Sequence, residues 1–102
     1  MTGVREIKET RHPSGALMWR IELSDGQPHG TEELWSPEGL LSQRVHYKNG
    51  VQHGPYQAWW ANGQKKEEGT YRNGQKVGPY YWYKDTGELW SQHEYAKPDD
   101  AE

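Results

Sequence analysis

Hydrophobic and polar positions alternate most clearly along residues 16–23. A two-residue period places successive side chains on opposite faces of a β-strand, so this segment predicts a strand. Short runs rich in Trp and Tyr recur along the rest of the chain, bounded by Gly, Asn, Asp or Pro. The strands that the pattern predicts are 5–11, 16–23, 31–36, 40–47, 55–60, 64–71, 79–84 and 88–95. No segment shows the period of a helix.

The pattern repeats every 24 residues. Ten of the twelve glycines fall in one register without an insertion or deletion. They are Gly15, Gly39, Gly63 and Gly87; Gly26, Gly50 and Gly74; and Gly30, Gly54 and Gly78. A fixed period of this length indicates a repeat architecture, and each unit holds two predicted strands. The chain is therefore interpreted as successive β-hairpins, of which the first is degenerate.

Turn residues indicate how the strands connect. Asn62-Gly63 is typical of a two-residue hairpin turn, because both residue types tolerate a positive φ. Such a turn would pair Ala61 with Gln64. Asn49-Gly50 and its equivalents, each followed by a recurrent Gly, are assigned to the connection between one hairpin and the next.

The alternation of 16–23, carried through the repeat, assigns the two faces of the sheet. One face is predicted to be apolar and holds Leu17, Trp19, Ile21, Leu23, Leu34, Leu41, Val45, Tyr47, Tyr56, Ala58, Tyr71, Tyr80, Trp82, Leu89 and Tyr95. The more polar opposite face holds Trp35, Trp59 and Tyr83, one per repeat, with Met18 and Trp90 on neighbouring strands. Across a hairpin, Trp90 is expected to oppose Tyr83, and Lys66 to oppose Trp59 in a cation–π contact. This apolar stripe is either a binding surface or a brace for the sheet.

Composition excludes several classes of function. The chain has 102 residues, a formal net charge of −3, six Trp, seven Tyr and no Cys. Without Cys there is no disulfide, thiolate zinc site or cysteine nucleophile, and the interspersed charges argue against a nucleic-acid partner. No apolar run approaches the roughly 20 residues of a membrane span, and the first residues lack the apolar core of a secretion signal. A cytoplasmic protein is therefore expected.

Candidate catalytic groups form no recognisable site. His29 and His53 occupy the same repeat position before a recurrent glycine, where a turn role is expected rather than metal binding. Neighbouring carboxylates such as Glu67 and Glu68 divide between the two faces of a strand and are expected to be solvated. The glycines serve turns rather than phosphates, so no enzyme activity, metal or cofactor is expected.

Residues 49–74 contain Asn49-Gly50, Gly54-Pro55-Tyr56, Asn62-Gly63 and Tyr71 in sequence order. This copy resembles the MORN-repeat variant family found in bacteria. A second copy, with Gly78-Pro79-Tyr80, resembles it too, and residues 26–47 are a weaker copy. The resemblance covers roughly residues 26–95. It implies a single-layer sheet of successive hairpins.

Bacterial members of that family are commonly grouped as antitoxin or immunity proteins, which implies a protein partner, a toxin. Eukaryotic relatives have been linked to membrane lipids and to scaffolding, but this acidic chain lacks the basic patch that a lipid surface attracts. Acidic residues would instead steer a basic toxin. The partner-binding candidates are Met18, Trp35, Trp59, Tyr83, Trp90, Glu33 and Glu68.

The sequence therefore predicts an all-β fold, a single-layer elongated antiparallel meander of about four hairpins. These hairpins, at 5–23, 31–47, 55–71 and 79–95, form one domain over 1–95, followed by a solvated tail at 96–102. The predicted function is non-catalytic protein–protein binding, as an immunity or antitoxin-like protein. The alternatives are a scaffold that self-associates through open sheet edges and an aromatic repeat that holds a small ligand or a cell-wall component.

Overall fold

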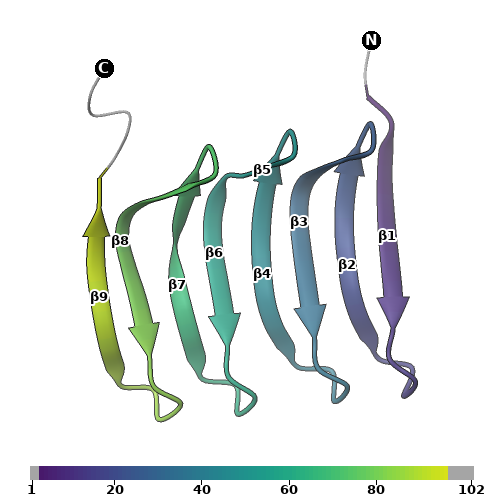
Figure 1. Ribbon diagram of the computed structural model, residues 1–102. Coiled ribbons are helices and arrows are strands. Elements are labelled where there is room, and N and C mark those ends of the chain that lie inside the picture. The colour runs from purple at the N-terminus through teal and green to yellow at the C-terminus, as the bar shows by residue number, and fades with distance from the viewer. Residues whose placement is uncertain (1–2, 97–102) are drawn as a thin grey trace.

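The computed structural model describes residues 3–96, which form one antiparallel β-sheet (Figure 1). Its strands are β1 (Arg5–Arg11), β2 (Leu17–Ser24), β3 (Gln27–Trp35), β4 (Leu41–Lys48), β5 (Val51–Gln52), β6 (Gly54–Trp59), β7 (Lys65–Arg72), β8 (Gln75–Tyr83) and β9 (Leu89–Tyr95). Their order is β1-β2-β3-β4-β6-β7-β8-β9, and β5 pairs with β4. The predicted all-β meander is confirmed. Residues 3–96 contain no helix, and hence none long and apolar enough to cross a membrane.

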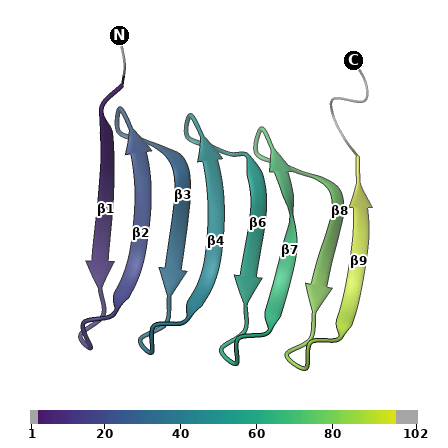
Figure 2. The same ribbon diagram turned by 180° about the vertical axis from the view of Figure 1, so that it is seen from behind.

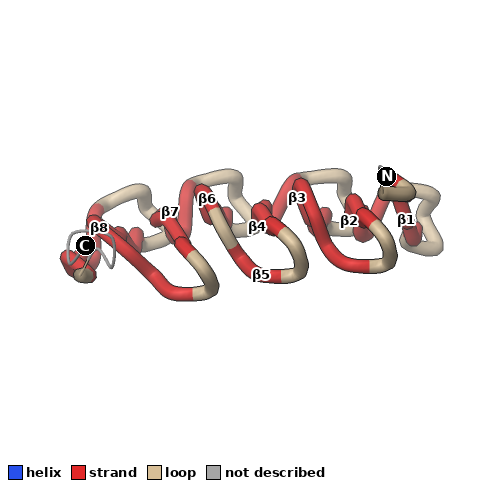
Figure 3. The backbone as a smooth tube through the Cα atoms, turned by 90° about the horizontal axis from the view of Figure 1, so that it is seen from above, coloured by secondary structure: helices blue, strands red, loops and turns tan. Residues whose placement is uncertain are grey.

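The sheet is a single layer. Its extents are 44 × 39 × 11 Å, and the shortest dimension accommodates one sheet with its side chains. Figures 1 and 2 show the two faces, with β1 and β9 at opposite edges, and Figure 3 shows the strands as one row. Of the predicted tail at 96–102, all but Ala96 lies outside the described residues.

The turns at the lower end of Figure 1, residues 12–16, 36–40, 60–64 and 84–88, have three-residue loops and are called the lower turns. Trp60 N donates to Gln64 O at 2.8 Å, and Gly63 N donates to Trp60 O at 2.9 Å. Only Gly63 of this loop has a positive φ, +90°. The two-residue turn predicted at Asn62-Gly63 is therefore wrong, because a three-residue loop with a glycine bulge closes the hairpin instead.

The turns at the opposite end are the two-residue ones, called the upper turns. Asp25-Gly26, Asn49-Gly50 and Asn73-Gly74 have positive φ at both positions, 53° and 81°, 51° and 84°, and 51° and 84°. These angles define type I′ turns, which match the twist of paired strands. Pairing resumes at once after each turn, so β3 and β8 begin at Gln27 and Gln75. The predicted strands 31–36 and 79–84 therefore begin too late.

Each strand that follows a lower turn leaves one residue without a cross-strand partner in that hairpin. These residues are Met18, Ser42, Lys66 and Trp90. Such a β-bulge shifts the register by one position. Trp59 therefore pairs with Lys65 rather than Lys66, and Tyr83 pairs with Leu89 rather than Trp90.

The same bulge moves two leucines out of the predicted apolar face. Leu41 pairs with Trp35, and Leu89 pairs with Tyr83. Cross-strand partners share a face, so both leucines belong with the aromatic residues of the opposite face. The predicted cation–π pair also changes: the Nζ atom of Lys66 lies 4.8 Å from the ring centroid of Trp60, not over Trp59.

Cross-strand pairing identifies the two faces. The first face carries the row Trp19, Leu34, Gln43, Ala58, Glu67, Trp82 and Ser91. The second face carries the row Arg20, Glu33, Arg44, Gln57, Glu68, Tyr81 and Gln92. The apolar character predicted for the first face is confirmed by its buried residues, Ile21, Leu23, Val45, Ala58 and Tyr80.

A chain of tyrosine rings thickens the first face near the C-terminal edge. Tyr56, Tyr71, Tyr80 and Tyr95 meet edge to face, with successive ring centroids 6.0, 6.3 and 5.8 Å apart. Tyr80 has no exposed surface, although the sheet has only one layer. Its ring lies against Gly69, where a Cβ atom would overlap it. The missing side chain at Gly69 is thus what allows the ring to pack against the backbone of β7.

Candidate functional site

The second face has two unlike halves. Towards the N-terminal edge it carries alternating charges that pair with one another: Arg20 lies 3.7 Å from Glu9, and Arg44 donates from Nε to Glu33 Oε2 at 2.8 Å. Towards the C-terminal edge it carries the aromatic residues Trp59, Tyr81 and Tyr83 instead. Ion pairs occur in both halves, since Lys65 pairs with Glu68 in the second. The second half adds three aromatic residues and is therefore the better candidate for contact with a partner.

Glu68 organises the aromatic half. Tyr83 donates its hydroxyl to Glu68 Oε2 at 2.6 Å, and Lys65 Nζ donates to Glu68 Oε1 at 2.9 Å. Lys65 is the cross-strand partner of Trp59. The sequence candidates Trp59, Glu68 and Tyr83 are therefore brought together, with Lys65 as the link that sequence reasoning missed. All four side chains are partly exposed.

These contacts shift the titration of both partners. The hydroxyl of Tyr83, then the ammonium of Lys65, lower the pKa of Glu68 below its ordinary value of 4.5. The hydrogen bond to Glu68 in turn raises the pKa of Tyr83 to about 12. The carboxylate thus stays ionised, and the ring of Tyr83 is held in one orientation beside it.

Removing the Tyr83 hydroxyl is expected to raise the pKa of Glu68. In Tyr83→Phe the first cause of the lowered pKa is absent, so Glu68 should titrate closer to 4.5. Carboxyl chemical shifts followed by NMR against pH measure this directly. Because the folded-state pKa of Glu68 is lowered, its stabilising contribution is present above the unfolded pKa and lost as the pH falls. Tyr81→Phe is the control and should leave the titration of Glu68 unchanged.

Met18 and Trp90 do not join this cluster. Both are bulge residues without a cross-strand partner in their hairpins. Trp90 is 70% exposed on the outer strand β9. The shallow hollow that it lines is shared with Trp82 and Ser91, which pair with each other on the first face. Glu33, paired with Arg44, and Trp35 lie on β3, which β4 separates from Trp59 on β6.

Two prolines and a tyrosine complete the aromatic half. A shallow hollow of about 320 Å³ lies over β6, β7 and β8, and Pro55, Gln57, Thr70, Pro79 and Tyr81 help to line it. Tyr81 stands 6.4 Å from Tyr83, ring centroid to centroid, with the planes tilted by 31°. Pro55 and Pro79 are the first residues of the predicted strands 55–60 and 79–84, and the sequence pattern marked neither as a site residue. Alternation from Tyr83 could have found Tyr81.

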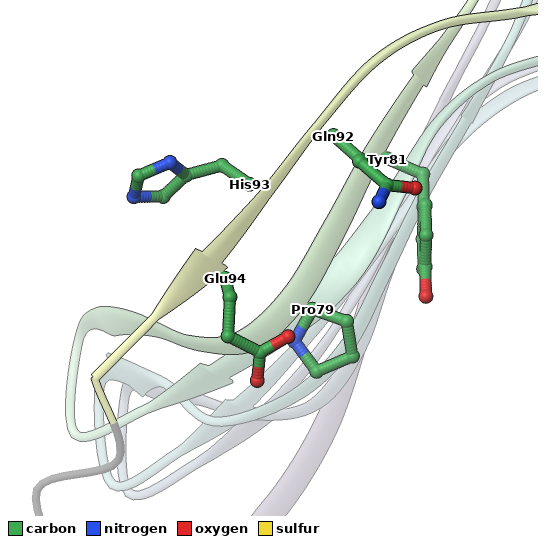
Figure 4. A pocket seen from close by; sticks show the side chains of 5 residues that line it. All are labelled: Pro79, Tyr81, Gln92, His93 and Glu94. Carbon is green, nitrogen blue, oxygen red and sulfur yellow. The ribbon is translucent and has the colours of Figure 1, made fainter.

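A second, smaller hollow continues this surface towards β9 (Figure 4). It holds about 110 Å³ and is lined by Pro79, Tyr81, Gln92, His93 and Glu94. In Figure 4 the His93 ring points to the side of β9 away from Tyr81. It contacts Tyr95 instead, with ring centroids 4.4 Å apart. The two hollows share Pro79 and Tyr81, so together they form one shallow, aromatic trough.

His29 and His53 each stabilise an upper turn. The Nδ1 atom of His29 accepts from Asn49 N at 3.1 Å, and that of His53 accepts from Asn73 N at 3.4 Å. Each thereby ties the next upper turn to the preceding repeat. No group of three His, Cys, Asp or Glu residues suited to a metal ion occurs within residues 3–96.

A hydrogen bond recurs on the first face between residues that are 13 apart. Trp19 Nε1 donates to Glu32 Oε2 at 2.7 Å, Tyr56 Oη to Gln43 Oε1 at 3.3 Å, and Tyr80 Oη to Glu67 Oε2 at 2.6 Å. In the first pair the donor precedes the acceptor in the sequence, and in the other two pairs the donor follows it. Glu32 and Glu67 are thus hydrogen-bonded and partly buried, so the prediction that such carboxylates are simply solvated is wrong.

One layer of equivalent hairpins, with side chains exposed on both faces, defines a repeat-based binding or scaffold module. The chain belongs to the MORN repeat variant family, whose model matches residues 28–49, 52–73 and 76–97. The first hairpin precedes these matches, yet its lower turn has the same hydrogen bonds, with Gly15 N donating to His12 O at 2.8 Å. No curated protein matches the chain.

Proposed function

We propose that this protein is a non-catalytic module that binds a protein partner through the aromatic half of its second face. The more specific role that we propose is that of an immunity or antitoxin-like protein, which neutralises a toxin in the cytoplasm by stoichiometric contact. The observation that carries the proposal is the set of aromatic side chains on this half. Tyr81 lines the shallow trough, and Tyr83 stands 6.4 Å from Tyr81 between ring centroids. Trp59 pairs with Lys65, which shares the carboxylate of Glu68 with Tyr83. Aromatic residues that are fixed and partly exposed are typical anchors of protein interfaces.

The shape of the molecule supports contact over an area rather than enclosure of a small substrate. A sheet with a shortest dimension of 11 Å presents a broad surface, and the hollows on the second face are shallow. Small-molecule sites instead surround most of their ligand. Tyr and Trp supply a large contact area at a low cost in side-chain entropy.

The net charge of the chain indicates the charge expected of the proposed partner. The chain carries a net charge of −3, which favours encounter with a basic protein. Glu33 and Glu68 are themselves engaged by Arg44 and Lys65. The steering therefore comes from the chain as a whole, while the aromatic side chains supply the contact that holds the complex.

Alanine at Trp59 or Tyr83 is expected to weaken partner binding about tenfold or more while the protein remains folded. Both side chains are partly exposed, so their loss should affect a complex more than the sheet. The partner is first captured from the native host with the intact protein and identified by mass spectrometry. Its affinity for each variant is then measured by calorimetry, alongside the urea midpoint. Val51→Ala, an exposed position in β5 directly after an upper turn, is the control.

A growth assay separates the immunity role from scaffolding. The captured partner is expressed alone and together with this protein, and growth is measured. Rescue by the intact protein and loss of rescue with Trp59→Ala would support neutralisation. A partner without toxicity would refute the immunity role, and equal losses of stability and binding in the variants would refute the aromatic site.

A further inference from the structure

Both outer strands of the sheet expose apolar side chains. The exposed large hydrophobic residues on or beside them are Val4, 70% exposed, Ile7, 54%, Leu89, 50%, and Trp90, 70%. Proteins usually protect such edges with charge, proline or short strands, and repeat proteins end in units with a polar outer side. The outer strand β9 lacks this protection, since Glu94 is its one Lys, Arg, Asp or Glu residue. The outer strand β1 is rich in charge, but of both signs, which a strand of complementary charge can pair with.

The junctions between hairpins show which strand would fit. The three junctions, β2 with β3, β4 with β6 and β7 with β8, have the same register, as the pairs Trp19↔Leu34, Gln43↔Ala58 and Glu67↔Trp82 show. In the 24-residue repeat, β9 is equivalent to β2, β4 and β7, and β1 is equivalent to β3, β6 and β8. The outer side of β9 thus matches one half of a junction, and the outer side of β1 matches the other half.

We propose that the protein associates head to tail, with β9 of one copy pairing antiparallel with β1 of a second copy in the register of the internal junctions. Transferring the β7–β8 register places Glu94 opposite Arg5 of the second copy, and Tyr95 opposite its Val4. Charge favours this pairing, because β1 carries Arg5, Lys8 and Arg11 against two Glu, whereas β9 carries Glu94 and no Lys or Arg. Apolar side chains that each edge now exposes would be covered at the same time.

This contact joins two different edges, so each added copy again presents a free β9 and a free β1. A heterologous contact of this kind does not close unless the sheet curves into a ring. The product is therefore a continuous sheet whose length depends on protein concentration. The inference does not rest on the toxin-binding role, since it uses the edges and not the aromatic trough.

Sedimentation velocity of the full chain over a range of concentrations tests the association. The average mass should rise with concentration for the intact protein and stay at the monomer value for Ile7→Lys and for Trp90→Lys. Lysine already occupies the repeat position of Trp90 in β7, as Lys66, so this variant should fold. Lys66 faces no cation across its junction, because the β7–β8 register continues from Glu67↔Trp82 to Tyr83. In the transferred register position 90 lies opposite Arg11 of the second copy, so a lysine there would oppose a like charge and weaken the contact. The controls are Leu40→Lys and Val51→Lys, which alter exposed apolar residues away from the edges and should associate like the intact protein.

Mixing the two edge variants tests the direction of the contact. Ile7→Lys keeps a normal β9 and Trp90→Lys keeps a normal β1, so the mixture should form one-to-one dimers, while each variant alone stays monomeric. A single variant that dimerises alone would show edge-to-like-edge pairing and overturn the proposal, as would an intact protein that is monomeric at every concentration. Charge reversal provides a second check: Arg5→Glu and Glu94→Lys should each weaken association, and the double variant should restore it.

Discussion

Valine at position 69 is expected to destabilise the protein by about 3 kcal/mol or more, because it combines overpacking with displacement of a buried ring. A side chain there would overlap the ring of Tyr80, which has no exposed surface. The backbone is not the obstacle, since Gly69 is not among the glycines with a positive φ. Valine also occupies the same repeat position in β4, as Val45. Urea unfolding of Gly69→Val measures the loss.

A double-mutant cycle isolates the steric cause. In a Tyr80→Ala background the ring is absent, so valine at position 69 should cost much less than it does in the intact protein. The comparison requires the four urea midpoints and slopes. A cost of Gly69→Val that is the same in both backgrounds would contradict the assignment of its effect to Tyr80.

Raising the pH beyond 10 is expected to unfold the protein. Most of the lost stability should come from ionisation of the tyrosines of the first face. Burial, then the charge of Glu67, raises the pKa of Tyr56 to about 12. Burial, then the hydrogen bond to Glu67, raises the pKa of Tyr80 from its ordinary value of 10.0. A pKa that is higher in the folded state gives stability that is fully present below the unfolded pKa and lost as the pH rises. The loss should therefore begin near pH 10 and continue past pH 12.

Urea midpoints measured between neutral pH and pH 12 check this expectation. Tyr80→Phe should be less stable at neutral pH, because Glu67 loses a charged hydrogen bond worth about 1.5–3 kcal/mol. The same variant should lose less of its stability as the pH rises. A midpoint that stays constant through pH 12 in the intact protein would show that these tyrosines titrate as freely as they do in the unfolded chain.

The architecture could be predicted because the sequence has two periods. The 24-residue spacing of glycines marks one hairpin per unit, and the two-residue alternation along 16–23 sorts side chains between faces. The alternation predicted the placement of Ile21, Val45, Ala58 and Tyr80 on one face, and the structure buries all four there. The order of apolar and polar residues was sufficient for this prediction, because successive side chains point to opposite faces in every strand.

The bulges could not be predicted in the same way. Asn-Gly occurs in both kinds of turn, at Asn62-Gly63 and at Asn73-Gly74, yet only the second adopts a type I′ geometry. The difference arises from the paired strands on either side rather than from the dipeptide. The bulge shifts the predicted pairing of Lys66 and Trp90 by one residue, so Lys65, and not Lys66, pairs with Trp59 in the site.

The recurrent hydrogen bond of the first face has a consequence for how the molecule can grow. Each bond spans a junction between hairpins, as those of Trp19 with Glu32 and Glu67 with Tyr80 do. A hairpin excised as a unit would leave one partner of the bond behind. A segment that begins and ends in the lower turns, such as 37–60, keeps Gln43 and Tyr56 together. The interchangeable module of this protein, for duplication or for building longer sheets, is therefore the pair of strands around an upper turn.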